Sequence, residues 1–248
     1  MVRAPAVLST RRAAALVALL GALAAWDAYA DRLPSSSDGW DVALVAVLVF
    51  PATFLVAWLL LPLAGERHLL EAALLTGALA ALLDLVGADG LFNVAKLVGF
   101  CLFGFWFAQM LEALVWIVLV AAIVPWVDVV SVYRGPTKIV VEEQPGLFER
   151  IAVAFAVPGE DGAARLGPPD VIFFALFLAA AARYGLRVRA TWLGMAGALS
   201  ATLLLTYAFD LNGLPALPAI SLGFLIPNAD LLWRSLRGEG RGTRPSPP

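Results

Sequence analysis

The chain has 248 residues, of which 61% are hydrophobic and 15% charged, and its formal net charge is -2. With a mean hydropathy of +0.86, this composition excludes a soluble globular domain and indicates an integral membrane protein that partners the lipid bilayer. No basic run interleaved with aromatic residues is present, which argues against nucleic acid as a partner. The only cysteine and the only histidine, Cys101 and His68, are too few for a metal centre, and no cofactor is expected.

Apolar windows of about 20 residues, the length of helix that crosses a hydrocarbon core of about 30 Å, predict the membrane spans. They are found at 13–30, 41–64, 69–87, 91–109, 112–133, 167–184, 190–209 and 214–233. The apolar stretch 91–133 is about twice the length of one span, so a tight turn is expected near Gln109 to Glu112. The predicted fold class is therefore all-α, a polytopic transmembrane bundle with about one span for each window.

The windows divide the chain into four parts. Residues 1–133 hold the N-terminal spans, 134–166 form an extramembrane connector, 167–233 form a three-helix part, and 234–248 have the composition of a disordered tail. Residues 1–30 also allow a second interpretation, a signal peptide cleaved after Ala30. Arginines cluster before the first window, between the sixth and seventh, and after the last, which predicts a cytoplasmic C-terminus.

Ionisable residues inside the windows are costly at membrane depth and usually face a partner, water or the bundle interior. Most of them lie near a window's end, where a solvated or structural role is expected, and Asp84 and Lys96 are candidates for a pair between neighbouring helices. Asp128 and Asp170 differ because they flank the same connector. Each has a local interpretation, Asp128 as an interfacial acid and Asp170 as a helix N-cap or first-turn acid. Together they predict a carboxylate pair sharing one proton, as in aspartic proteolysis.

The last window begins with the sequence PALP at residues 215–218. Two prolines three residues apart deprive the local backbone of two amide donors, which favours a loosely hydrogen-bonded segment able to lie beside a substrate strand. In the connector, the runs PTKIVVEE at 136–143 and AVAFAV at 152–157 are β-branched or alternating. They predict an interfacial strand pair or an amphipathic segment.

With two aspartates around a long loop and a PAL motif opening the last helix, the chain resembles the presenilin and signal-peptide-peptidase type intramembrane aspartyl proteases, above all their archaeal and bacterial members. The segments WVDVVSVYRGPTKIVVE, LGPPD and PALP carry the resemblance. It implies that Asp128 and Asp170 are catalytic and that Gly167 is the first glycine of the GxGD motif. It also implies that Pro215, Ala216, Leu217 and Pro218 line the substrate site. A connector strand, AVAFAV above all, would by the same resemblance pair with an unwound substrate through β-strand addition.

Three features depart from that family's pattern. Val127 stands where the family has tyrosine before the first aspartate, Pro169 stands where it has glycine before the second, and the windows number one fewer than the family's nine spans. The expected function is cleavage of single-span transmembrane proteins in a prokaryotic plasma membrane. The alternatives are a catalytically silent protein that binds such helices, and a proton-coupled transporter, although no symmetric pair of broken helices is visible. The sequence does not predict an oligomeric state.

Overall fold

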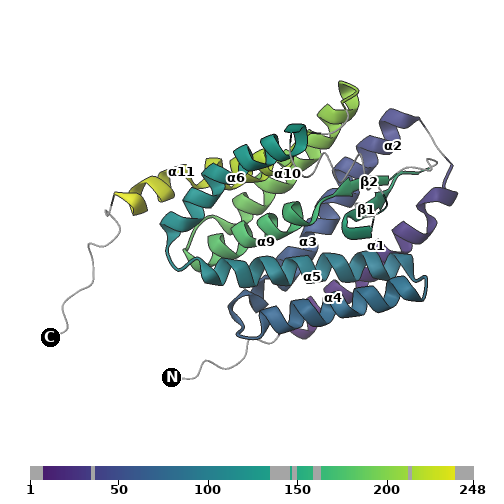
Figure 1. Ribbon diagram of the computed structural model, residues 1–248, viewed down its shortest axis with the longest axis horizontal. Helices are drawn as coiled ribbons and strands as arrows, with labels where there is room; N and C mark the ends of the chain where they lie inside the picture. The colour runs from purple at the N-terminus through teal and green to yellow at the C-terminus, as the bar shows by residue number, and fades with distance from the viewer. Residues whose placement is uncertain are drawn as a thin grey trace.

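The structure is a computed structural model, and it describes residues 8–34, 37–134, 146, 150–158, 163–211 and 214–237. Helices dominate this part of the chain (Figure 1). The α-helices and strands are α1 (Thr10–Tyr29), α2 (Asp38–Leu44), α3 (Phe50–Leu60), α4 (Leu69–Leu85), α5 (Asp89–Met110), α6 (Leu114–Arg134), β1 (Val153–Ala156), β2 (Ala163–Leu166), α9 (Pro168–Arg183), α10 (Val188–Ala208) and α11 (Leu217–Leu236).

Every predicted window coincides with a helical segment. The second window contains α2 and α3 joined by a π-helical turn, η2 (Val45–Val49), and extended by a 3-10 turn, η3 (Leu61–Gly65). The wide turn lies just before Pro51, which has no amide to donate to the preceding turn. The turn expected near Gln109 is confirmed, because α5 ends at Met110 and α6 begins at Leu114.

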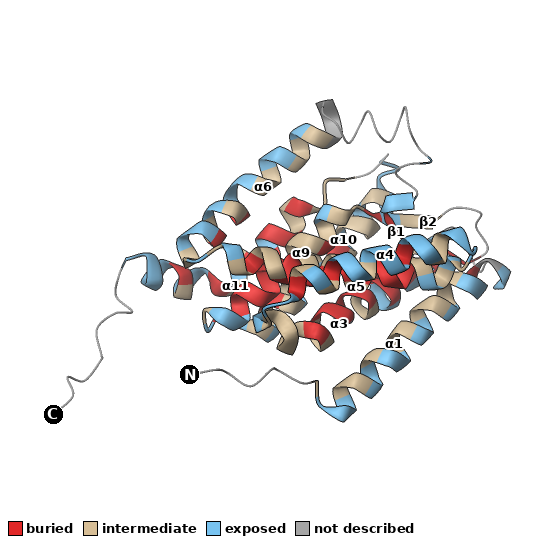
Figure 2. Ribbon diagram, turned by 60° about the horizontal axis from the view of Figure 1, so that its bottom comes forward, coloured by how far each residue is buried: buried red, intermediate tan, exposed pale blue. Residues whose placement is uncertain are grey.

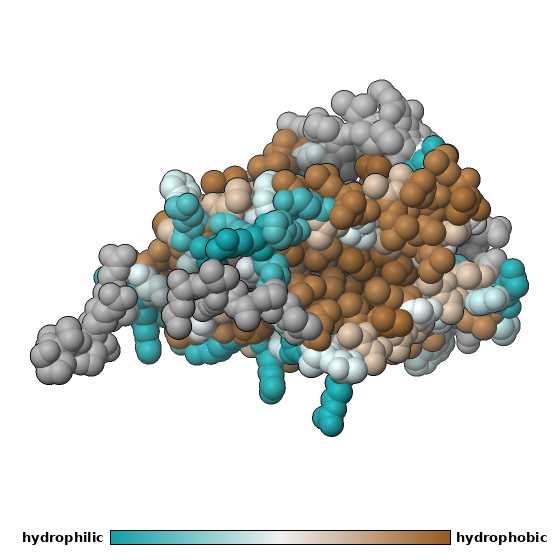
Figure 3. Space-filling model, turned by 90° about the horizontal axis from the view of Figure 1, so that it is seen from below, coloured by the Kyte–Doolittle hydropathy of each residue, from teal (hydrophilic) through white to brown (hydrophobic). Residues whose placement is uncertain are grey.

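Five helical segments of the described chain are long and apolar enough to cross a membrane: Thr10–Tyr29, Gly39–Gly65, Asp89–Met110, Leu114–Ser131 and Val188–Ala208. Several apolar helices of this kind indicate a membrane protein. The surface agrees with this conclusion, since Figure 3 shows a broad, continuous apolar area across one part of the face it presents. Exposed leucines on α4, Leu74, Leu75, Leu79 and Leu82, belong to the apolar surface of the molecule.

Helix α9 lies at the centre of the bundle, and α1 and α6 lie at its periphery (Figure 2). A nearly continuous run of α9, from Phe174 to Ala181, is buried. Phe174 stacks on Phe54 of α3 with ring centroids 4.1 Å apart, and Phe177 stacks on Phe224 of α11 at 4.8 Å. Stacked rings in a close-packed interior fix the rotation of α9 about its axis. This rotation determines where Asp170, in the first turn of α9, can point.

The two ends of the bundle are held by different polar contacts. At one end, Arg183 donates to the carbonyl of Ala108 at 3.2 Å, which ties the end of α9 to the end of α5. At the same end, Arg187 forms a bidentate pair with Asp230 of α11, with N–O distances of 2.6 and 2.8 Å. The opposite end carries the antiparallel pair of β1 and β2, in which Val153 lies opposite Leu166. The connector therefore returns to the bundle at the end where α9 and α11 begin.

Candidate aspartate site

The PALP segment forms the start of α11, as the sequence predicts. Pro215 and Ala216 precede the helix, and Leu217 and Pro218 are its first two residues. A helix N-terminus presents backbone amides without partners in the helix, and these favour a nearby negative charge. Proline at the second position removes one of these amides without cost to the helix.

Asp128 supplies that negative charge. Its Oδ2 accepts a hydrogen bond from the Leu217 amide at 3.0 Å, and the Ala216 backbone also acts on the carboxylate. Asp128 lies in the last part of α6, three residues after Pro125, and is half-buried. The contact joins residues 89 positions apart in sequence. The first aspartate and the proline motif, predicted to share a site, are therefore in direct contact.

Asp170 is the second carboxylate of the site. It is the third residue of α9, and its Oδ2 accepts a hydrogen bond from the amide of Gly167 at 3.0 Å. The Asp170 amide in turn donates to the Gly167 carbonyl at 3.1 Å, which completes a reciprocal cap on the helix. This is the first-turn role that the local interpretation gives to Asp170. It also holds the carboxylate in one orientation.

Asp128 and Asp170 lie near enough to each other for their charges to interact. Helices α6, α9 and α11 pack against one another around them. Each carboxylate is fixed by a backbone amide, Leu217 for Asp128 and Gly167 for Asp170. The site therefore contains two oriented carboxylates, of which one can hold a proton while the other is ionised.

Pro169 occupies the second position of α9 and is exposed. An amide at this position has no partner within the helix, so proline fits here without breaking the hydrogen-bond pattern. The departure from glycine therefore leaves the first turn of α9 intact. Its physical consequence is stiffness, because proline fixes φ near about -65°.

The run AVAFAV contains β1, and both edges of that strand are occupied. One edge pairs with β2. On the other side, Asn93 binds both the amide and the carbonyl of Ala154, and the Trp26 indole donates to the Ala156 carbonyl. A substrate strand cannot add to β1, so the interpretation of this run as a strand pair is favoured. The neighbouring run PTKIVVEE at 136–143 lies outside the described residues.

Among the described residues, Asp84 and Lys96 do not form a direct ion pair, although the Asp84 charge acts on the Lys96 ammonium. Asp84 lies 3.9 Å from the guanidinium of Arg150, and the Lys96 ammonium donates to the carbonyls of Arg150 and Ala152. Both side chains therefore contact residues of the connector. Within the described residues, no group of three or more metal-ligating side chains occurs.

Comparison of the chain with protein-family models, curated proteins and solved structures finds no match. The functional argument therefore depends on the geometry of the aspartate site and on the sequence motifs that form it.

Proposed function

We propose that this protein is an intramembrane aspartyl endopeptidase that hydrolyses transmembrane helices with Asp128 and Asp170. The observation that carries the proposal is the hydrogen bond between the Leu217 amide and Asp128, which places the proline motif directly on a carboxylate of the pair. Its fold would be that of a presenilin-like bundle in which all eight windows span the membrane.

The chemistry requires a water molecule and a scissile carbonyl between the two carboxylates. The ionised aspartate takes a proton from water as the water oxygen bonds to the carbonyl carbon, and the protonated aspartate gives its proton to the carbonyl oxygen. Collapse of the resulting gem-diol breaks the carbon–nitrogen bond. The leaving nitrogen receives a proton from the carboxyl group that took one from water, and one gem-diol hydroxyl returns its proton to the other carboxylate, which restores the starting state of the pair. Neither aspartate is assigned one role, because the pair titrates as a coupled system.

A substrate helix presents no free carbonyl until its backbone hydrogen bonds open, and open bonds in lipid are costly without partners. The PALP segment supports this step, since Pro215 and Pro218 carry no amide and the Leu217 amide is bound to Asp128. Substrates of this proposal are single-span membrane proteins that enter from the bilayer and unwind beside α11.

The arrangement of basic residues supports a cytoplasmic C-terminus in a prokaryotic plasma membrane. Arg187 pairs with Asp230, so the arginine-rich turn between α9 and α10 lies at the same end as the C-terminal half of α11. Arg11 and Arg12 begin α1, whose opposite end contacts β1 through Trp26. The described arginines of the three basic clusters thus lie towards one end of the bundle, as cytoplasmic clusters do, and the aspartate site lies towards the other.

A catalytically silent protein that binds single-span helices is the second candidate. It is favoured by the fact that each aspartate already serves a helix N-terminus, Asp170 as a cap on α9 and Asp128 beside the first amide of α11. In this case the carboxylates stabilise the starts of α9 and α11 rather than cut the peptide.

The test is cleavage of a panel of single-span substrates by purified, reconstituted protein across pH, with binding measured in parallel. The variants are Asp128→Asn, Asp170→Asn and, as a matched control, Asp89→Asn at an exposed position at the start of α5. We expect cleavage by the wild type and the control alone, and inhibition by a transition-state analogue of aspartic proteases. Cleavage by either dyad variant would refute the proposal, and binding without cleavage by the wild type would establish the second candidate.

A further inference from the structure

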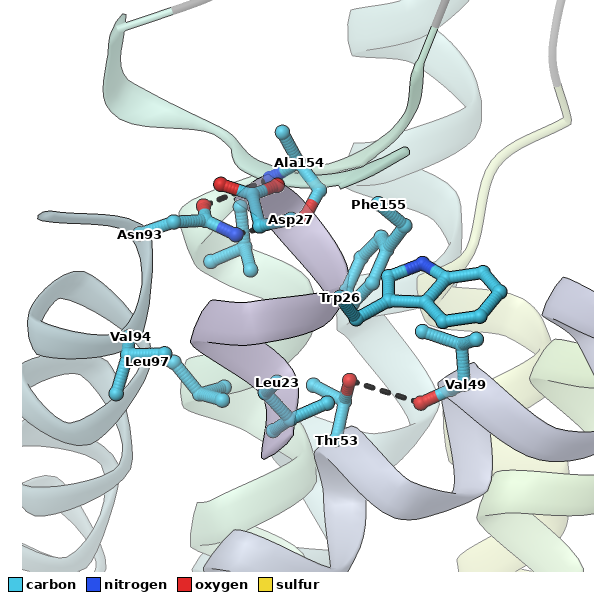
Figure 4. A pocket seen from close by; sticks show the side chains of 11 residues that line it. Leu23, Trp26, Asp27, Val49, Thr53, Asn93, Val94, Leu97, Ala154 and Phe155 are labelled. Carbon is cyan, nitrogen blue, oxygen red and sulfur yellow. Dashed lines mark hydrogen bonds between the residues drawn. The ribbon is translucent and has the colours of Figure 1, made fainter. Parts of the chain in front are cut away.

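Strand β1 is fastened to the N-terminal helices by side chains rather than by another strand. Asn93 of α5 donates to the Ala154 carbonyl at 2.7 Å and accepts from the Ala154 amide at 2.9 Å. Trp26 of α1 donates to the Ala156 carbonyl at 3.0 Å. Figure 4 shows Asn93 beside Ala154 and Trp26 beside Phe155.

Lys96, one turn after Asn93 on α5, extends the same contact. Its ammonium donates to the Arg150 carbonyl at 2.9 Å and to the Ala152 carbonyl at 2.5 Å, and it lies 4.1 Å from the centroid of the Phe92 ring. We call Trp26, Asn93 and Lys96 together the strand clamp. The clamp holds backbone groups of β1 and of the residues just before it, at positions 150, 152, 154 and 156.

The clamp is a costly way to hold a strand if stability is its only role. Asn93 is 9% exposed and Lys96 is 8% exposed, and buried polar and charged groups are tolerated only when they are hydrogen-bonded. Apolar packing already fastens the hairpin without that desolvation cost, since Phe155 of β1 packs on Phe50 of α3 with ring centroids 4.8 Å apart. Polar bonds differ from apolar packing in specifying one position of the backbone, because a shift of one residue would leave every donor without its acceptor.

The position of β1 is transmitted along the chain to Asp170. Leu166 of β2 lies opposite Val153 of β1, and Gly167 follows it directly. The Gly167 amide holds the Asp170 carboxylate at 3.0 Å. Between these two residues stand Pro168 and Pro169, whose rings fix φ and stiffen the link. A displacement of the β1–β2 hairpin would therefore move the Asp170 carboxylate, because the stiff link does not bend to compensate.

We propose that the strand clamp of Trp26, Asn93 and Lys96 positions the Asp170 carboxylate for hydrolysis through β1, β2 and the Pro168–Pro169 link. This inference rests on the proposed protease function. The clamp residues touch neither the reacting carboxylates nor the peptide, so they are positioning residues. The N-terminal helices thereby contribute to the geometry of a site whose aspartates both lie after residue 127.

The clamp itself is tested by amide hydrogen exchange in the full-length protein in detergent. The Ala154 amide is bonded to Asn93, so Asn93→Leu, which keeps the size of the side chain, should accelerate exchange in 153–156 at least tenfold. Exchange in α10 and α11 should stay unchanged. Gln109→Ala is the matched control, because Gln109 also lies on α5 and donates to two backbone carbonyls, those of Ala64 and Glu66, at the other end of the bundle. Unchanged exchange in 153–156 would overturn the clamp.

The positioning role is tested by steady-state cleavage with the same proteins. For Asn93→Leu we expect kcat to fall at least tenfold while KM changes by less than twofold, since the substrate site is intact and the carboxylate is misplaced. Lys96→Met should behave in the same way, and Lys96→Arg, which keeps the donors, should restore most of kcat. Trp26→Phe removes a single donor and should give a smaller loss, which provides a measurement if the polar variants fold poorly.

The outcomes separate the two proposals. If the wild type binds single-span substrates but does not cleave them, the protease function is refuted, and so is the positioning role that rests on it. Amide exchange in 153–156 would still report whether the clamp exists. A wild type that cuts, with Asn93→Leu showing faster exchange but unchanged kcat, refutes positioning and leaves the protease function standing. A rise in KM with kcat unchanged would also overturn the inference, because it would place the clamp in substrate binding.

Discussion

Gly194→Ala and Gly197→Ala form a matched pair of variants on α10, one that should destabilise the protein and one that should not. A Cβ at Gly194 would meet the carbonyl oxygen of Gly223 on α11 at 2.5 Å and Pro227 Cγ at 3.2 Å. A Cβ at Gly197, nearly one turn later, would have nothing within 4 Å. Both variants add the same methyl group to the same helix, so they differ only in what that methyl group meets.

The magnitude follows from this comparison. Alanine is preferred over glycine in a helix by up to about 1 kcal/mol, and this preference cancels between the two variants. What remains is overpacking at Gly194, which typically costs about 1–3 kcal/mol. The 2.5 Å approach is about 1 Å shorter than the optimal separation of about 3.5–4.0 Å, and the obstructing atom is backbone that cannot rotate away. We expect Gly194→Ala to have a free energy of unfolding about 2–3 kcal/mol below that of Gly197→Ala.

The assay is unfolding by a denaturing detergent in mixed micelles, followed by circular dichroism and tryptophan fluorescence. Gly197→Ala should match or slightly exceed the wild type, which controls for the general effect of the substitution. Equal free energies of unfolding for the two alanine variants would show that α10 and α11 do not cross at Gly194 and Gly223, and the packing argument would be wrong.

Three further predictions use the same preparations. Asn228→Leu removes a fully buried amide that binds the Thr191 hydroxyl at 2.7 Å and the Arg187 amide at 2.9 Å, and should lower the free energy of unfolding by about 2–3 kcal/mol; an unchanged value would contradict those bonds. In the wild type, the bidentate pairing with Asp230 raises the pKa of the Arg187 guanidinium. The guanidinium therefore stays charged at every accessible pH, so the pair weakens only in acid, as Asp230 gains a proton. Arg187→Lys loses this pairing. The deficit in Tm of the lysine variant should be small, should shrink in acid and should vanish in high salt; a deficit independent of salt would contradict an ionic role. Pro169→Gly should loosen the link before Asp170, lower the unfolding free energy by up to about 1 kcal/mol and reduce kcat; a higher kcat would show that the proline is inhibitory.

Part of the aspartate site could be predicted from the sequence. Asp128, Asp170 and the PALP segment were recognisable because a charge in an apolar window and a pair of prolines at a helix start are local signals. Lys96 also stood out as a charge in a window, but its partners did not, because they are backbone carbonyls 54 and 56 residues away. Asn93 gave no signal at all, since nothing in a single sequence distinguishes a clamping amide from a solvated one.

The sequence by itself determined the helices, their approximate ends and the membrane environment. Hydropathy is a property of consecutive residues, and a helix in lipid satisfies its backbone within its own segment, so the window and the helix coincide. Window 91–109 became Asp89–Met110, and window 190–209 became Val188–Ala208. Only the tertiary structure decided that α9 lies at the core rather than at the lipid surface. It also decided that Leu217 binds Asp128 and that the N-terminal helices hold β1. Those features are contacts between residues far apart in the chain, and a local pattern carries no information about which distant group fills the space beside it.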